Sequence, residues 1–238
     1  MLKIILFFPL ALITTPQIIP EHILQPPSFE YWLGTNSLGQ NLFLLLLKSL
    51  GISSIIAFFS VLGSCAIGLF FVYLSQFSKT LSNFFFTLFS GLPNQLIILF
   101  LLIFFKSNIL LFIIIFAMTS WPGFYKILSE EFQLIQKKDF YLAGYVLGIS
   151  SHRLFFFYFI PQIQVLLNNA ILFFFISSII QQTSLGFLGI SPTDYPSLGA
   201  IINEGRPLLF FQPWICFSGL FTLIFFTSFI KYKIKKIK

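Results

Sequence analysis

Residues 50–74 read LGISSIIAFFSVLGSCAIGLFFVYL, a run of 25 residues without a charged side chain. A helix needs about 20 apolar residues to cross the hydrocarbon core of a bilayer. The apolar residues of this run form one block, whereas a half-buried strand or a surface helix shows them as a periodic stripe. The run therefore predicts a membrane-spanning helix.

The remainder of the chain has the same character. Of its 238 residues, 57% are hydrophobic and 9% are charged, against about 25% charged residues in a soluble domain, which excludes a water-soluble globular fold. Further blocks suited to spans are residues 81–105, 109–124, 164–180 and 208–230. We expect an all-α polytopic transmembrane helical bundle that forms a single domain over residues 1–238.

Residues 2–19 form a weaker block, because Pro9, Pro16 and Gln17 interrupt it. With Lys3 as its basic flank, the block resembles a signal peptide, yet no small-residue cleavage pattern follows it. We therefore interpret it as an uncleaved first helix. The expected number of spans is then about six.

The basic residues indicate the orientation of these spans, since cytoplasmic loops carry an excess of Lys and Arg. With a cytoplasmic N-terminus, 11 of the 14 basic residues lie on the cytoplasmic side. Both termini are then cytoplasmic, and segments 20–47 and 186–207 face outward. The basic tail, 231–238, is expected to rest on anionic lipid headgroups, with a protein-binding role as the alternative.

The residues needed for catalysis are missing from the predicted spans. No acidic residue lies inside a span, and His-Glu-x-x-His, Gly-x-Ser-x-Gly and the phosphate-binding loop are absent from the sequence. His22 and His152 lack partners at metal-ligand spacing, and Cys65 and Cys216 lie in apolar blocks. We predict that the chain is not an enzyme and has no cofactor, metal site or nucleic-acid partner.

One long polar stretch, residues 121–161, lies between predicted spans and is expected to face the cytoplasm as two or three short helices. Asp139 is placed to cap one of these helices, and Gly148 to end it in the left-handed conformation. Ser151 is a candidate cap for the next segment, and Pro161 marks the return to the membrane.

The helix expected over residues 140–147 is short and apolar, and Ala143 and Gly144 leave room for close approach. An exposed helix of this kind suits a groove on a partner protein. Spacing alone leaves equally open a loop that packs beneath its own bundle.

The order Leu142-Ala143-Gly144, Gly148, then Tyr158-Phe-Ile160-Pro161 keeps the spacing of the motif Glu-Ala-Ala-x3-Gly-x9-Ile-x-Leu-Pro. This stretch resembles the coupling loop of binding-protein-dependent ABC importers. The differences are Leu142 for Glu, Gly144 for Ala and Tyr158 for Ile. The missing Glu would have completed a capping box with Asp139.

Two further segments resemble the peptide/nickel-type permeases of that class. Residues 31–43, YWLGTNSLGQNLF, are similar to the family's Leu-Gly-Thr-Asp-x-x-Gly-Arg-Asp stretch, with neutral Asn36, Gln40 and Asn41 in place of two acids and an Arg. Hydrogen bonding can survive these replacements, whereas ion pairing cannot. Residues 184–190, SLGFLGI, with Gly199, Glu204-Gly-Arg206 and Pro213-Trp214, resemble the family's outward loop.

The resemblance implies an inner-membrane permease subunit with the type I ABC importer fold, in the bacterial cytoplasmic membrane. A second homologous permease, two cytoplasmic ATPase subunits and an extracytoplasmic substrate-binding protein would be its partners. The substrate would be a dipeptide, an oligopeptide, nickel or a metal chelate. The residues implied in ATPase coupling are Asp139, Leu142, Ala143, Gly144, Gly148, Ile160 and Pro161. The rival class is a polytopic scaffold or assembly protein without transport activity.

Polar residues elsewhere suggest two further sets of contacts. Small and polar residues in the fifth span are candidates for the pore or for helix contacts: Asn168, Asn169, Ser177 and Ser178. Charged residues of the outward loop are candidates for contact with the binding protein, and they could equally hold the loop together: Asp194, Glu204 and Arg206.

Overall fold

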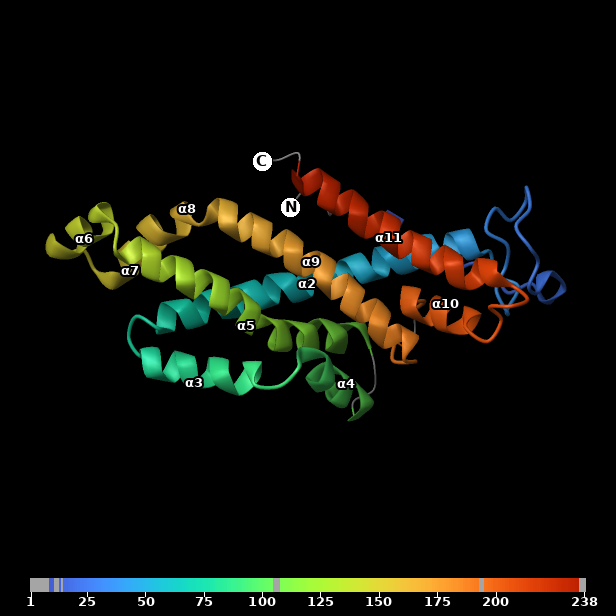
Figure 1. Ribbon diagram of the computed structural model, residues 1–238, viewed down its shortest axis with the longest axis horizontal. Coiled ribbons are helices and arrows are strands. Elements are labelled where there is room, and N and C mark those ends of the chain that lie inside the picture. The colour runs from blue at the N-terminus through green and yellow to red at the C-terminus, as the bar shows by residue number, and fades with distance from the viewer. Residues whose placement is uncertain (1–8, 11–12, 14, 105–107, 193–194, 236–238) are drawn as a thin grey trace. The chain divides into compact units, whose positions relative to one another are not determined.

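The computed structural model describes residues 9–10, 13, 15–104, 108–192 and 195–235, most of which are helical (Figure 1). Within these ranges the β structure amounts to one isolated bridge between Thr35 and Asn41, which confirms the all-α class. The elements, in chain order, are η2 (Pro20–His22), α2 (Leu42–Leu74), α3 (Lys79–Ser90), α4 (Asn94–Phe104), α5 (Ile109–Gln136), α6 (Asp139–Val146), α7 (Ser151–Arg153), the π-helical η3 (Leu154–Phe159), α8 (Ile160–Gln162), α9 (Gln164–Phe187), α10 (Leu198–Gly205) and α11 (Pro213–Lys235).

Four helices in the described part of the chain are long and apolar enough to cross a membrane: α2, α5, α9 and α11. The expected span 81–105 is broken into α3 and α4, which are bent by 74° and count as a fifth span if taken together. Pro93 explains the break, because it has no N–H to donate and it disfavours the helical conformation at Leu92. The block 2–19, expected as the first span, lies mostly outside the described residues.

The chain divides into two compact units. The first comprises Met1–Phe58, Leu99–Ile113 and Phe175–Lys238, and the second comprises Phe59–Ile98 and Ile114–Phe174. Helices α2, α4, α5 and α9 each contribute residues to both units. The first unit contains α10 and α11, whereas α3 and the chain from α6 to α8 belong to the second.

In the second unit, α2 and α5 pack through small residues. The hydroxyl of Ser64 donates to the carbonyl oxygen of Ala117 at 3.1 Å and to that of Ser60, one turn earlier, at 2.9 Å. The rings of Phe71 and Trp121 stack with centroids 4.2 Å apart. Small residues that let two backbones approach are the usual means of helix association in membranes, where apolar burial drives little association.

In the first unit, the segment before α2 folds around its neutral polar residues. The Asn36 side-chain oxygen accepts from the amides of Leu38 at 3.1 Å and Gln40 at 2.8 Å, and its amide nitrogen donates to Gln40 Oε1. Asn41 Oδ1 accepts from the amide of Phe43 at 3.0 Å, at the start of α2. The neutral residues Asn36, Gln40 and Asn41 thus hold this segment together by hydrogen bonds.

Helix α10 lies in the same unit and is capped by Ser197, whose hydroxyl oxygen accepts from the amide of Ala200 at 3.1 Å. Its buried residues Leu198, Ile201 and Ile202 face the unit's interior. Near its C-terminus, Glu204 Oε1 accepts from the amide of Ser37 at 2.8 Å. This bond joins α10 to the segment that precedes α2.

At Gly68 the helices α2 and α5 lie too close together for a larger side chain. An added Cβ at this position would lie 2.7 Å from Phe124 Cβ. We expect Gly68→Val to destabilise the protein by about 1–3 kcal/mol, because neither backbone can yield. Thermal unfolding in detergent measures the effect. Ala66→Val, at an exposed position of the same helix, is the matched control and should leave the unfolding temperature unchanged. Equal unfolding temperatures for the two variants would contradict this packing.

Candidate functional site

The polar stretch 121–161, which contains the spacing motif, falls on the chain from α5 to α8, and the structure corrects the expectation for its first part. Residues 121–136 continue α5 instead of forming a separate polar segment. Pro122 lies inside the helix without ending it, because Phe124, Leu128, Phe132 and Ile135 keep an apolar stripe that is buried. The separate short helices of this stretch therefore begin after Gln136.

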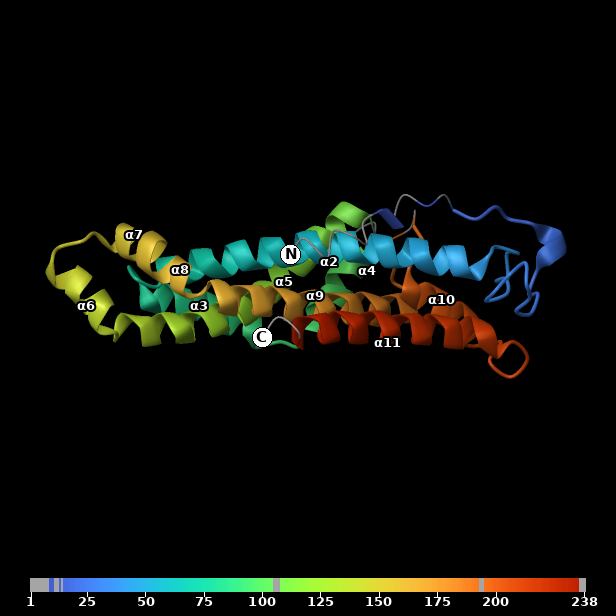
Figure 2. The ribbon, with the colours of Figure 1, turned by 90° about the horizontal axis from the view of Figure 1, so that it is seen from above.

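Helix α6 follows after a turn and lies beyond the end of α5 in both views (Figure 1, Figure 2). Its N-cap is Lys138, with extended backbone, and Asp139 is the first helical residue and makes no capping hydrogen bond. The expectation that Asp139 caps this helix is thus wrong by one residue. Its exposed carboxylate still lies in the first turn, where it complements the helix dipole.

Gly148 ends α6 in the left-handed conformation, as predicted, with φ of +75°. Its amide donates to the carbonyl of Tyr145 at 3.0 Å, and the amide of Ile149 donates to that of Gly144 at 3.1 Å. These two bonds form a Schellman motif, which satisfies the last carbonyls of the helix. An added Cβ on Gly148 would meet no atom within 4 Å, so the constraint at this position is the backbone conformation alone.

One side of α6 is anchored to its neighbours. Tyr141 is buried, and its ring meets that of Phe132 of α5 edge-on, with centroids 6.3 Å apart. Burial raises the pKa of the Tyr141 phenol above 10, and a hydrogen bond with the Gln136 side chain opposes this shift. Gly144, also buried, lies against Leu154 of η3. The helix is held on α5 and on η3 at once.

The other side of α6 is apolar and exposed. We call it the α6 surface, and it comprises Phe140 (37% exposed), Leu142 (49%), Tyr145 (70%), Val146 (82%) and Leu147 (80%). Ala143, from the motif, is exposed beside them. An eight-residue helix that buries two residues and exposes four large ones, with a fifth at its C-cap, has its apolar side turned outward. This arrangement is typical of a docking surface.

The return toward α9 is helical from residue 151 onward, with a break at Ile163. The N-cap of α7 is Ser150, so the expectation that Ser151 caps this segment is also wrong by one residue. Pro161 lies inside α8, where its ring would clash with the carbonyl of Phe157 in a regular α-helix. The π-helical turn of η3 precedes it, with the amide of Ile160 donating to the carbonyl of Phe155, and provides the wider spacing.

The polar residues predicted on α9 differ in exposure. Asn168 is exposed and Asn169 half-buried, and both belong to the second unit. In the first unit, Ser177 is half-buried, whereas Ser178 is buried and accepts a hydrogen bond from Gln182 Nε2 at 3.2 Å. Ser178 thus participates in contacts within the protein.

Of the residues suggested for binding-protein contact, Glu204 is engaged with Ser37, as described above. Arg206 is exposed, and its guanidinium carbon lies 5.7 Å from the centroid of the Phe187 ring. Asp194 lies outside the described residues. The structure therefore places Glu204 in a contact internal to its unit and leaves Arg206 accessible.

Two features of the structure had no signal that we recognised in the sequence. Tyr73 at the end of α2 makes a 2.6 Å hydrogen bond with Nδ1 of His152 in α7, and the two residues lie 79 positions apart in the sequence. The exposure of Val146 and Leu147 could not be predicted either, because apolar residues in a hydrophobic chain are normally expected to be buried. In the described part of the chain, His, Cys, Asp and Glu form no group of three or more that could hold a metal ion.

Comparison of the sequence with known proteins identifies a family. Residues 60–234 match the family described as the inner membrane component of binding-protein-dependent transport systems. The chain is 23% identical over 206 residues to the dipeptide transport system permease protein DppC of Alkalihalophilus pseudofirmus, covering 84% of this chain and 68% of that protein.

Two further relatives have similar names. The oligopeptide transport system permease protein OppC of Bacillus subtilis is 23% identical over 198 residues, covering 81% of this chain and 65% of that protein. The inner membrane ABC transporter permease protein YejE of Escherichia coli is 26% identical over 208 residues, covering 85% and 61%. The chain therefore spans about two thirds of the length of the relatives that it matches.

The anchoring of α6 predicts different effects for its two tyrosines. Tyr141→Ala removes a buried ring from the joint between α6 and α5, so we expect hydrogen exchange at the amides of residues 139–148 to accelerate at least tenfold. Tyr145→Ala, on the exposed side of the same helix, should leave these rates within about twofold. Hydrogen exchange with mass spectrometry measures both variants, and equal protection would show that Tyr141 does not anchor α6.

Proposed function

Since this chain belongs to the family of inner membrane components of binding-protein-dependent transport systems, we propose that it forms half of the translocation path of an ATP-driven importer for peptides. Its family confirms the resemblance drawn from the motif, the multi-pass location in the bacterial inner membrane and the expectation of a transport subunit that is not itself an enzyme. The substrate, the coupling residues and the partner subunits are the content of the proposal.

The observation that carries the coupling proposal is the α6 surface. It is exposed and apolar, it lies on the motif of the importer coupling loop, and its opposite side is anchored by Tyr141 and Gly144. We assign this surface to a groove on a cytoplasmic ATPase subunit. Coupling would involve the motif residues Asp139, Leu142, Ala143, Gly144, Gly148, Ile160 and Pro161.

The packing of α6 suggests how the signal would travel. Tyr141 ties α6 to α5, and Gly144 ties it to η3 through Leu154. A movement of the ATPase groove would displace α6 with these neighbours as one body, rather than bend a flexible loop. The movement would then be transmitted to α5 and to the chain that leads to α9.

The peptide substrate is supported by the names of the relatives, which refer to dipeptide and oligopeptide transport. Nickel or a metal chelate is the other substrate class of the wider family that the motifs resemble. Partners would be a second homologous permease, two ATPase subunits and an extracytoplasmic binding protein, which would supply much of the selectivity. Asn168, Asn169 and Ser177 are the remaining candidates for the path, and Arg206 for contact with the binding protein.

A polytopic scaffold or assembly protein is the rival class, and it requires no ATPase partner. Purification of the full chain from its own cells in mild detergent separates the two functions. Stoichiometric recovery of an ATPase supports the importer, whereas recovery of the intact chain without one supports the scaffold.

Val146→Asp places a charge at the most exposed residue of the α6 surface, where it would be buried in an apolar groove. We expect recovery of the ATPase and uptake of labelled dipeptide to fall at least tenfold, since an unpaired buried charge is costly. The control is Phe29→Asp, which changes a fully exposed apolar residue in the proposed outward segment. Normal ATPase recovery and dipeptide uptake with Val146→Asp would refute the docking assignment, and dependence of nickel uptake alone on this gene would transfer the proposal to a metal substrate.

Gly148 offers a second test, with a closely matched control. Gly189 has φ of +88°, would also have no atom within 4 Å of an added Cβ, and ends α9 through the same pair of hydrogen bonds. Gly148→Leu and Gly189→Leu should therefore cost similar backbone strain, about 1–2 kcal/mol. Only Gly148→Leu should separate ATP hydrolysis from uptake while leaving membrane insertion intact. Normal uptake by this variant would contradict the assignment of Gly148 to coupling.

A further inference from the structure

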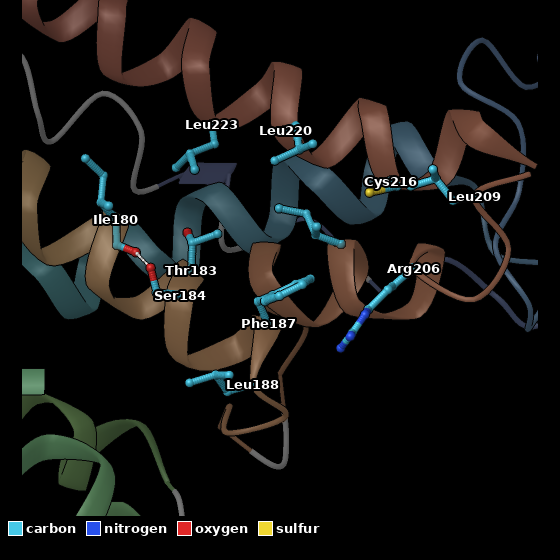
Figure 3. A pocket seen from close by; sticks show the side chains of 11 residues that line it. Ile180, Thr183, Ser184, Phe187, Leu188, Arg206, Leu209, Cys216, Leu220 and Leu223 are labelled. Carbon is cyan, nitrogen blue, oxygen red and sulfur yellow. Dashed lines mark hydrogen bonds between the residues drawn. The ribbon is translucent and has the colours of Figure 1, made fainter. Parts of the chain in front are cut away.

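A groove of about 540 Å³ lies in the first unit, bordered by the C-terminal part of α9, by α10 and by the N-terminal part of α11 (Figure 3). Leu220 and Leu223 line it from α11, and Phe187 lines it from the end of α9. Its volume is in the range of ordinary ligand sites. None of the residues used for the coupling proposal lines it.

The two hydroxyl groups that line the groove already have acceptors. Thr183 Oγ1 donates to the carbonyl of Ile179 and Ser184 Oγ to that of Ile180, each at 2.9 Å. Because both hydroxyls donate to their own helix, the walls present apolar surface to an occupant. A peptide inserted here would find neither hydroxyl free to donate to its backbone C=O groups, at a cost in free energy. The occupant that fits the walls is a hydrocarbon chain.

One end of the groove has a positive charge. Arg206 lines it from the C-terminal end of α10, and its guanidinium lies beside the Phe187 ring. Among the described residues no carboxylate forms an ion pair with Arg206, and nearby Glu204 accepts hydrogen bonds from Ser37 instead. The planar guanidinium is thus available to an anion, and phosphate is the group that it recognises with two parallel hydrogen bonds.

The groove is short enough to lie within one leaflet of a bilayer. On α11 its lining residues run from Cys216 to Leu223, a rise of about 10 Å along the helix axis. One leaflet has about 15 Å of hydrocarbon, half of the roughly 30 Å core. Arg206 is exposed, precedes the start of α11 in the sequence and lies near Phe187 at the edge of the groove (Figure 3). An occupant would therefore have its charged group near the membrane surface and its chain in one leaflet.

We propose that this groove binds an anionic phospholipid, with an acyl chain between α9 and α11 and the phosphate on Arg206. The acyl chain fills a groove whose two hydroxyls donate to their own helix. The phosphate neutralises a guanidinium that has no counter-charge among the described residues. The inference requires only that α9 and α11 span the membrane, so it does not depend on which substrate the protein transports.

The test uses the full chain in mild detergent, with whatever subunits co-purify, and adds phosphatidylglycerol or phosphatidylcholine of the same acyl chains. Native mass spectrometry measures the bound lipid. We expect the wild type to prefer phosphatidylglycerol by about tenfold, and Arg206→Gln to abolish that preference. Arg153→Gln, at an exposed arginine of α7, is the matched control and should retain it. Equal binding of the two lipids by the wild type, or equal preferences in the two variants, would overturn the proposal.

A second measurement tests the location of the acyl chain and distinguishes a lipid from a protein occupant. Phosphatidylglycerol with a photoreactive acyl chain, in vesicles that contain the assembled protein, should label peptides from α9 and α11, and Leu220→Trp should reduce this labelling severalfold by filling the groove. Labelling that avoids these helices, or that Leu220→Trp leaves unchanged, contradicts the proposal. So does a photoreactive residue at position 220 that links to a second permease instead of to lipid.

Discussion

The fold depends on one constraint, which is that a backbone polar group in hydrocarbon must find its partner within the protein. The helices α2, α5, α9 and α11 meet it through their own backbone hydrogen bonds. Several of their hydroxyl side chains follow the same rule, since Ser54, Thr119 and Thr183 donate to carbonyls one turn earlier. A polar residue in a span is therefore weak evidence for a pore. Ser178 illustrates the point, because its oxygen accepts a bond from Gln182 of the same helix.

The constraint is relaxed where the chain leaves the spans, and there the structure relies on specific side chains. Helix α6 has eight residues, too few to be stable alone, so its formation depends on packing. Tyr141, Gly144 and the Schellman motif at Gly148 provide that support on one side. Because these contacts use only one face, the apolar residues of the other face remain exposed. The same packing thus holds α6 in place and leaves its apolar face exposed.

The sequence predicted the helical class and the left-handed Gly148 because both follow from strong local preferences, the first from long apolar blocks and the second from a residue without Cβ. It misplaced the end of α5, because the polar residues after Trp121 concealed a stripe of buried residues that includes Leu128 and Phe132. The break at Pro93 was readable in principle, but the hydropathy of the block masked it. Contacts between distant residues, such as Tyr73 with His152, had no local signal at all.

Position 142 shows how the structure changes an argument based on a motif. With Asp139 as the cap, residue 142 would be the third helical residue after it, and the missing Glu would leave a capping box incomplete. The structure has Lys138 as the cap, so Tyr141 occupies that place and position 142 falls one residue later. A Glu there would complete no capping box with this cap. Leu142 instead extends the apolar surface beside Val146, which lies one turn further along the helix, so the substitution changes what α6 can contact rather than how α6 is held.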